Sequence, residues 1–210
     1  MKEIDKNVYK IKNIYPIHFH QGIFCILLIS LLPTIIHPNS LRIHILSISN
    51  WTIYLDILGF ILPVLICMFL IIKRHIDIKF IIISLIPVSL MSYLMATPIL
   101  EKGIVSPFPL WLFPPLMVGV IVLSNKHVLR KNLYSYAFIL GVFSVIIGAD
   151  LAHLPALLNY TSTTSMQAIF GGAGIFDLIF LSGIFSILFL KFLTFIQKYE
   201  KIKISKDYFI

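Results

Sequence analysis

Apolar segments long enough to cross a membrane alternate with short polar connections along the chain. Runs of about 20 apolar residues predict transmembrane helices. The predicted spans cover residues 21–36, 51–72, 78–97, 108–124, 133–157 and 168–190. Neither a strand-like alternation nor an internal repeat is evident. The pattern predicts an all-α, polytopic integral membrane protein of about six helices, folded as a single membrane domain over residues 1–210.

Composition excludes a water-soluble domain. Hydrophobic residues make up 59% of the chain and charged residues only 12%, whereas soluble domains are about half apolar and a quarter charged. The two cysteines, Cys25 and Cys67, lie in apolar runs without the spacing of a zinc or redox site. We therefore expect a lipid bilayer as the surroundings of the chain, and no cofactor.

The net charge of +8 is a topology signal. Fifteen of the seventeen Lys and Arg residues lie in the N-terminal arm, the loops 73–79 and 125–132, and the tail from Lys191. This asymmetry predicts that both termini are cytoplasmic and that the chain is a multi-pass protein of the plasma membrane. The basic residues form no stripe with interleaved aromatics, so no nucleic-acid partner is expected. Asn159 begins a glycosylation sequon on the predicted outer side, and its modification stays open.

Three carboxylates fall inside the predicted spans, all in the outer half of the membrane. Each would cost about 2.5 to 3.5 kcal/mol at the membrane centre, so an interior or water-filled site is favoured over a lipid-facing one. Asp150 and Asp177 are predicted at matching depth on consecutive helices, which favours a functional pair. Asp56 alone is more typical of a solvated helix end. If the pair face each other, at least one carboxyl holds a proton near neutrality.

The fifth predicted helix carries distinct residues on two faces. His153 follows Asp150 by three residues and is expected on the same face, with a functional role and a capping or interface role both open. The opposite face carries a stripe of small residues that is predicted to pack against one neighbouring helix. The stripe consists of Ala137, Gly141, Ser144, Gly148 and Ala152. We therefore expect this helix to be central.

Two further features are predicted to distort helices. The pair Pro114-Pro115 removes two backbone donors, so the fourth span is expected to kink or break. The glycines Gly171, Gly172 and Gly174 precede Asp177 and have poor helix propensity. They favour either a tight helix crossing or a broken helix whose positive end lies just before the carboxylate, as at transporter substrate sites.

A family resemblance rests on these same residues. Gly148-Ala149-Asp150-Leu151 with His153-Leu154, followed by Gly171-Gly172-Ala173-Gly174 and Phe176-Asp177, resembles an uncharacterised family of archaeal and bacterial multi-pass membrane proteins, a domain of unknown function. The specific match covers residues 148–184, and Ile175 and Leu178 depart from it. The resemblance implies that Asp150 and Asp177 form the site. It implies no activity.

Three functions are compatible with these residues, and whether the chain is an enzyme stays open. The favoured one is the handling of an ion, a proton or a small solute by Asp150, Asp177, His153 and Asp56. An intramembrane aspartyl protease is an alternative, because two aspartates sharing a proton could activate water. A non-catalytic subunit of a membrane complex is another. A zinc site of Asp150, His153 and Asp177 is a lesser variant, without a recognised ligand spacing.

Overall fold

The computed structural model describes residues 41–99, 103–129, 132–160 and 165–207. The predicted span 21–36 lies outside them, so the total of six spans and the single domain over residues 1–210 stay predictions. The described residues belong to a unit that begins at Leu41. Most of them are helical, and strands are also present.

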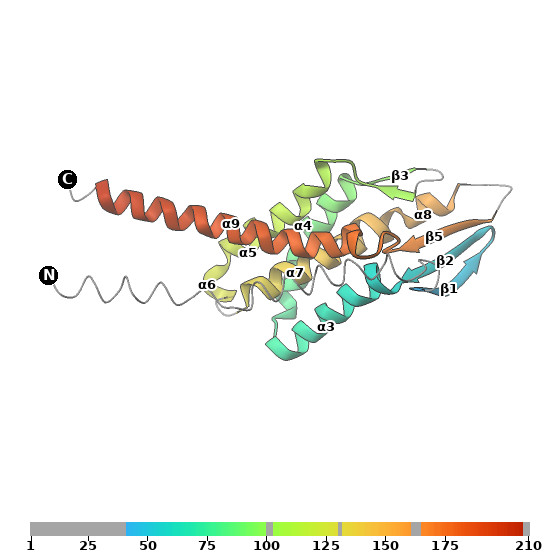
Figure 1. The fold of residues 1–210 in the computed structure, drawn as a ribbon, viewed down its shortest axis with the longest axis horizontal. Coiled ribbons are helices and arrows are strands. Elements are labelled where there is room, and N and C mark those ends of the chain that lie inside the picture. The colour runs from blue at the N-terminus through green and yellow to red at the C-terminus, as the bar shows by residue number, and fades with distance from the viewer. Residues whose placement is uncertain (1–40, 100–102, 130–131, 161–164, 208–210) are drawn as a thin grey trace. The chain divides into compact units, whose positions relative to one another are not determined.

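Helical segments run alternately between the two ends of this unit (Figure 1). They are Ile57–Arg74 (π-helix η2, Ile57–Ile61, then α3, Leu62–Arg74), α4 (Ile78–Leu94), Leu110–Ser124 (η3, Leu110–Leu112, then α5, Phe113–Ser124), Leu133–Leu158 (α7, Leu133–Ser144, π-helix η4, Val145–Leu151, and α8, Ala152–Leu158) and α9 (Leu178–Asp207). The short helix α6 (Lys126–Leu129) joins α5 to α7.

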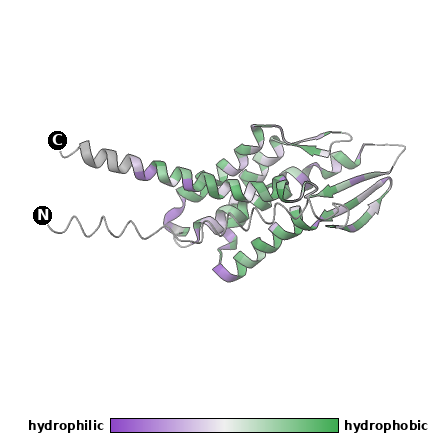
Figure 2. Cartoon of the chain, in the orientation of Figure 1, coloured by the Kyte–Doolittle hydropathy of each residue, from purple (hydrophilic) through white to green (hydrophobic). Residues whose placement is uncertain are grey.

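Length and exposure of these helices indicate membrane association. Among the described residues, Ile57–Arg74, Leu133–Leu158 and Leu178–Tyr199 are long and apolar enough to cross a membrane, whereas Ile78–Leu94 and Leu110–Ser124 are shorter. Apolar residues cover the helices of the bundle (Figure 2). Large apolar side chains are exposed on α3, α4 and α9, among them Leu65, Phe69, Ile72, Ile82, Ile83, Ile86, Leu90, Leu188, Phe192 and Phe195. So large an apolar surface fits lipid and not water.

Hydrogen bonds gather the basic loops at one end of the helices. The Asn132 side chain donates to the Arg74 carbonyl over 2.9 Å, and the Lys126 ammonium donates to the Gln197 side chain over 2.8 Å. The loop after α3, the segment around α6 and the distal part of α9 therefore lie together. We call this the basic end. Its cytoplasmic location stays a prediction.

Strands form at the opposite end, so the all-α prediction is wrong there. The strands β1 (Arg42–Ile48), β2 (Trp51–Asp56) and β5 (Met166–Phe170) form a sheet in the order β1-β2-β5, with β1 antiparallel and β5 parallel to β2. A hairpin of β3 (Thr97–Ile99) and β4 (Gly103–Val105) lies separately. The predicted spans starting at 51 and 168 thus begin as strands.

The composition of β2 explains both the strand and the error. Trp51, Thr52, Ile53 and Tyr54 are aromatic or β-branched, which favours a pleated surface. They are also apolar enough to merge with the helix that follows when only hydropathy is considered. Trp51 and Ile53 pack with Leu157 of α8 and Ala168 of β5, so the sheet is attached to the end of the central helix.

The proline pair begins a helix and does not break one. Pro114 and Pro115 lie in the first turn of α5, directly after the 3-10 turn η3, and both are buried. Backbone donors in a first helical turn have no intrahelical acceptor, so proline costs little there. Of the predicted kink or break in the fourth span, the structure shows a change from 3-10 to α-helix directly before the prolines, and α5 itself continues without interruption.

Helix α7 is central, as predicted, because it contacts α3, α4, α5 and α9. Contrary to the prediction, however, its stripe of small residues does not pack against a single neighbouring helix. Gly141 packs against Ser182, Gly183 and Ser186 of α9, whereas Gly148 packs against α4. The intervening π-helix η4 has more residues per turn than an α-helix, which turns the later part of the stripe toward a different helix.

The Gly148 contact generates a stability prediction. A Cβ atom at Gly148 would overlap the backbone carbonyl of Ser89, which cannot move aside as a flexible side chain can. We expect Gly148→Ala to destabilise the fold by about 1–3 kcal/mol, the usual cost of overpacking. The control is Gly172→Ala, whose Cβ would lie 3.3 Å from the nearest atoms, those of Ile169. Thermal unfolding in detergent should show a lower midpoint for Gly148→Ala alone; equal midpoints would contradict the close α4–η4 contact.

Membrane orientation is tested by labelling single cysteines. With Cys25 and Cys67 replaced by alanine, a membrane-impermeant thiol reagent added outside intact cells should modify Ser165→Cys and spare His127→Cys. Both positions are exposed on the protein surface, so access from one side of the membrane decides the result. The reverse labelling pattern would invert the predicted orientation.

Candidate functional site

Asp56 is the buried cap of a helix N-terminus. It is the last residue of β2, and its Oδ1 atom accepts hydrogen bonds from the backbone N–H groups of Leu58 at 2.9 Å and Gly59 at 2.8 Å. Only 6% of its surface is exposed. Asp56 therefore lies at a helix end, as the sequence favours, but this end is buried and not solvated. It is a desolvated carboxylate held at the start of η2.

Asp177 caps the N-terminus of α9 in the same way. Its Oδ1 atom accepts from the Ile179 N–H at 3.0 Å, and its Oδ2 atom accepts from the Ala173 N–H at 3.3 Å. The prediction that it lies well inside the sixth helix is wrong, because that helix begins at Leu178. Both carboxylate oxygens of Asp177 are fixed by backbone amides.

The glycine cluster forms the loop that leads from β5 into α9. Gly171 and Gly174 have φ angles of 74° and 62°, in the left-handed region that favours glycine. The Gly174 N–H donates to the Gly171 carbonyl at 2.9 Å and closes a turn, in which Gly172 is exposed. Of the two predicted arrangements, the loop is closer to the broken helix before Asp177 than to a helix crossing.

Gly59 brings the two capped helix starts together. A Cβ atom at Gly59 would overlap the carbonyl of Gly171 and lie 2.7 Å from that of Gly174. A Cβ atom at Gly171 would in turn lie 2.5 Å from the Gly59 backbone. This contact leaves the carboxylates of Asp56 and Asp177 close enough to repel each other.

Asp150 is the third acid of this group. It lies in η4, within the membrane-length helical segment Leu133–Leu158, is half-buried, and interacts electrostatically with Asp177. No group among the described residues donates a hydrogen bond to its carboxyl. We call these three aspartates the acid cluster. Two of them, Asp56 and Asp177, cap helices and are held by backbone amides, whereas Asp150 accepts no such hydrogen bond from the described residues.

Several electrostatic effects shift the pKa of the Asp177 carboxyl. Burial raises the pKa of its carboxyl above the ordinary value, because ionisation is disfavoured away from water. The amide hydrogen bonds from Ile179 and Ala173 lower the pKa, and the negative charge of Asp56 raises it. The net direction is upward.

His153 is not part of the acid cluster. Its ring is buried, its Nδ1 atom lies 3.0 Å from the Ala149 carbonyl, and it stacks on Tyr93 of α4 with ring centroids 4.4 Å apart. The ring therefore packs against α4. Among the described residues no three His, Cys, Asp or Glu side chains gather as metal ligands, so the zinc variant gains no support.

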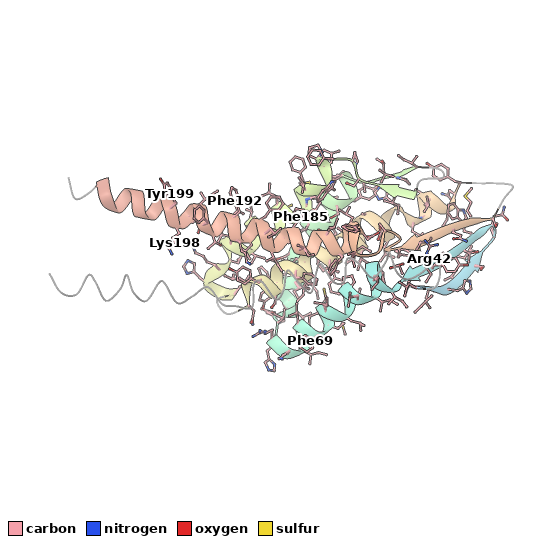
Figure 3. All side chains as sticks on the ribbon, viewed as in Figure 1. Arg42, Phe69, Phe185, Phe192, Lys198 and Tyr199 are labelled. Carbon is pink, nitrogen blue, oxygen red and sulfur yellow. The ribbon has the colours of Figure 1, made fainter. Side chains whose placement is uncertain are left out.

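Sequence reasoning missed Gly59 and Arg42. Gly59 looks like one glycine in an apolar run, and only its contact with Gly171 gives it a role. Arg42, labelled in Figure 3, pairs with Asp56 in the β1-β2 ladder, so it brings a basic residue to the strand next to the acid cluster. Without the strand assignment, no sequence signal connects these two residues.

Comparison with known proteins identifies the family. Residues 7–189, which include the whole acid cluster, match the model of a family described as "Protein of unknown function (DUF1614)". No curated protein and no solved structure matches the chain. The expected membership of an uncharacterised family is confirmed, while its archaeal and bacterial range stays a prediction. Because the match covers most of its length, the chain belongs to the DUF1614 family of proteins of unknown function.

Proposed function

We propose that this protein handles protons or small cations in the membrane, with Asp150 as the carboxyl group that exchanges the ion. The observation that supports this role is the position of Asp150. It lies in an apolar helix of membrane-spanning length, next to Asp177, and no described residue donates a hydrogen bond to it. An ionisable residue in such a place is costly and is usually retained for a function.

The fixed neighbours of Asp150 favour ion exchange. Asp56 and Asp177 accept amide hydrogen bonds at helix N-termini, where the positive end of the helix dipole stabilises negative charge. A third negative charge beside them would be repelled in surroundings of low dielectric constant. A proton or a cation bound at Asp150 removes this repulsion. The negative charges of the fixed pair therefore favour the binding of a proton or cation at Asp150.

The local backbone supports the same role. Asp150 lies in a π-helical segment of seven residues, Val145–Leu151. Such segments depart from the regular hydrogen-bond pattern of the α-helix and frequently occur at functional sites. In a membrane helix, irregular backbone is tolerated where it is buried in protein or borders a wet cavity.

The protease alternative receives less support from this geometry. An aspartyl protease needs two carboxyl groups that share a proton and orient a water molecule. Both oxygens of Asp177 accept hydrogen bonds from the backbone, so this carboxylate already has a structural task. A role as a subunit, with the acids paired to a partner's basic residues, stays a prediction that isolation of a folded single chain would oppose.

Ion handling is tested in liposomes that contain the purified chain. Asp150→Asn keeps the shape of the side chain and removes its charge and titration, so we expect proton or cation flux to fall at least tenfold. The matched control is Asp77→Asn, which changes an exposed helix cap at the basic end and should leave the flux unchanged. Flux would be followed with a pH-sensitive or cation-sensitive dye inside the liposomes. Equal flux in Asp150→Asn and wild type would overturn the proposal.

Stability should depend on the ionisation of Asp177. Its pKa in the folded chain is raised, so the folded state holds this proton more tightly than the unfolded state, whose carboxyl titrates near pH 3.9. The stabilisation is complete below about pH 3.9 and is lost as the pH rises through the folded pKa. Asp177→Asn retains a good cap and should lack this decline. Asp177→Ala should be about 1 kcal/mol less stable than Asp177→Asn at every pH, because neither variant titrates and only the alanine loses the cap.

Unfolding midpoints measured between pH 3.5 and 8 would separate these effects. A wild-type profile with the same slope as that of Asp177→Asn would contradict the raised pKa. A profile for Asp177→Ala that matches that of Asp177→Asn would contradict the capping role.

A further inference from the structure

Helices α7 and α9 run antiparallel, and serine residues lie between them. A Cβ atom at Gly141 of α7 would lie 2.5 Å from the Ser186 hydroxyl oxygen and 2.6 Å from the Ser182 carbonyl oxygen. The Ser186 hydroxyl thus points into the interface with α7. Ser144, Ser182 and Ser186 are each fully buried.

The helix register connects these serines to the acid cluster. Asp150 on η4 lies near Asp177, and Gly141 lies between Ser182 and Ser186. In an antiparallel pair one step along one helix matches one step back along the other, so Ser144 falls across from Ser182. At 1.5 Å per residue, Ser182 lies roughly 7 Å and Ser186 roughly 13 Å from Asp177 along the α9 axis.

Among the described residues, two of these hydroxyl groups have no hydrogen-bond partner in the protein. Ser144 donates to the Gly141 carbonyl at 2.9 Å. The hydroxyl oxygens of Ser182 and Ser186, by contrast, have no hydrogen-bond partner within the described part of the chain. A buried hydroxyl without a hydrogen bond costs about 1–3 kcal/mol, and in proteins such groups are commonly satisfied by buried water.

The sequence of α9 between the acid cluster and the basic end also sets these two serines apart. From Leu178 to Leu190, Ser182 and Ser186 are the only residues with polar side chains. Ser186 faces the interface with α7, and Ser182, four residues earlier, lies on the same face of α9. The surrounding apolar residues Leu188, Phe192 and Phe195 are exposed. The polar groups of this membrane-length helix are therefore concentrated on one line that leads away from Asp177.

We infer that Ser144, Ser182 and Ser186 form a hydroxyl ladder that binds water molecules and conducts protons between the acid cluster and the interior of the bundle. The inference rests on the proposed function and narrows the transported species to the proton. Each water molecule accepts a proton from one neighbour and passes one to the next. One proton therefore enters and one leaves, and no other covalent bond changes.

Proton flux tests the ladder directly. The full chain would be placed in liposomes with a pH-sensitive dye, and a potassium gradient with valinomycin would drive protons inward. The double variant Ser182→Ala/Ser186→Ala should lower the proton flux at least tenfold. The matched control is Ser92→Ala, which removes a buried hydroxyl of α4 that already donates to the Val88 carbonyl, and it should keep wild-type flux.

Bound water provides a readout that does not depend on transport. Infrared spectra of the chain in membranes should contain O–H stretching bands that shift when H2 18O replaces ordinary water. The double variant should lose these bands, and Ser92→Ala should keep them. Folding of the double variant is expected to be preserved, because alanine removes an unpaired buried group, and thermal unfolding would verify this.

The outcomes separate the two proposals. Flux that is lost in Asp150→Asn but kept in the double serine variant would overturn the ladder and leave the proposed function standing, as would a flux of sodium or potassium in place of protons. Absence of any ion flux in the wild-type chain would overturn the proposed function. The loss or retention of the water bands would then still decide whether the serines bind water.

Discussion

Backbone hydrogen bonding in apolar surroundings is the constraint on which the arrangement of this protein depends. The N-terminal amides of a helix have no partner within the helix, and lipid offers none. The helical segment that begins at Ile57 directly follows β2, and helix α9 follows β5 after the glycine loop; each receives an aspartate as its cap. The strands β2 and β5, which precede these starts, pair with each other. The direction of the chain, the pairing of the strands and the aspartate caps together satisfy the backbone amides at the two helix starts.

Capping both helix starts with aspartate has an electrostatic consequence. Parallel pairing of β2 with β5 delivers both capped helix starts to the same place, and the contact between Gly59 and Gly171 holds them there. Two carboxylates are thereby concentrated at one depth of the bundle. Each is stabilised by amides, so their presence has a structural explanation. Asp150 has no such explanation among the described residues, which is why the functional argument rests on it and not on the caps.

Sequence patterns predicted the helices better than their ends. The spans at 78–97 and 133–157 agree with α4 and with the α7–α8 segment to within a few residues. The strands were missed because hydropathy records apolarity and not conformation. In addition, the β2-β5 pairing joins Trp51 to Met166, which lie far apart in the sequence. No local pattern contains that contact.

The same limits explain the outcome for the candidate site. Embedded acids stand out in an apolar sequence, so Asp56, Asp150 and Asp177 could be identified without a structure. Asp177 interacts electrostatically with each of the other two, and their role as one site stays a prediction. The directions in which the side chains around Asp150 face could not be predicted, because the prediction assumed a regular α-helix there. The π-helix η4 changes the winding there, and His153 packs on Tyr93 of α4. Gly148 likewise contacts α4, although Gly141 contacts α9.

The distribution of polarity along α9 is consistent with a path for protons through an apolar bundle. Asp177 lies at its N-terminus, where the helix dipole stabilises negative charge, and Lys191 follows its apolar stretch in the middle of the helix. Between them only serine hydroxyls interrupt the apolar sequence. A hydroxyl costs far less to bury than an ionised group, yet it can both donate and accept a hydrogen bond. Serine hydroxyls can therefore lie in the apolar part of a membrane helix, between Asp177 and Lys191, and still pass a proton along it.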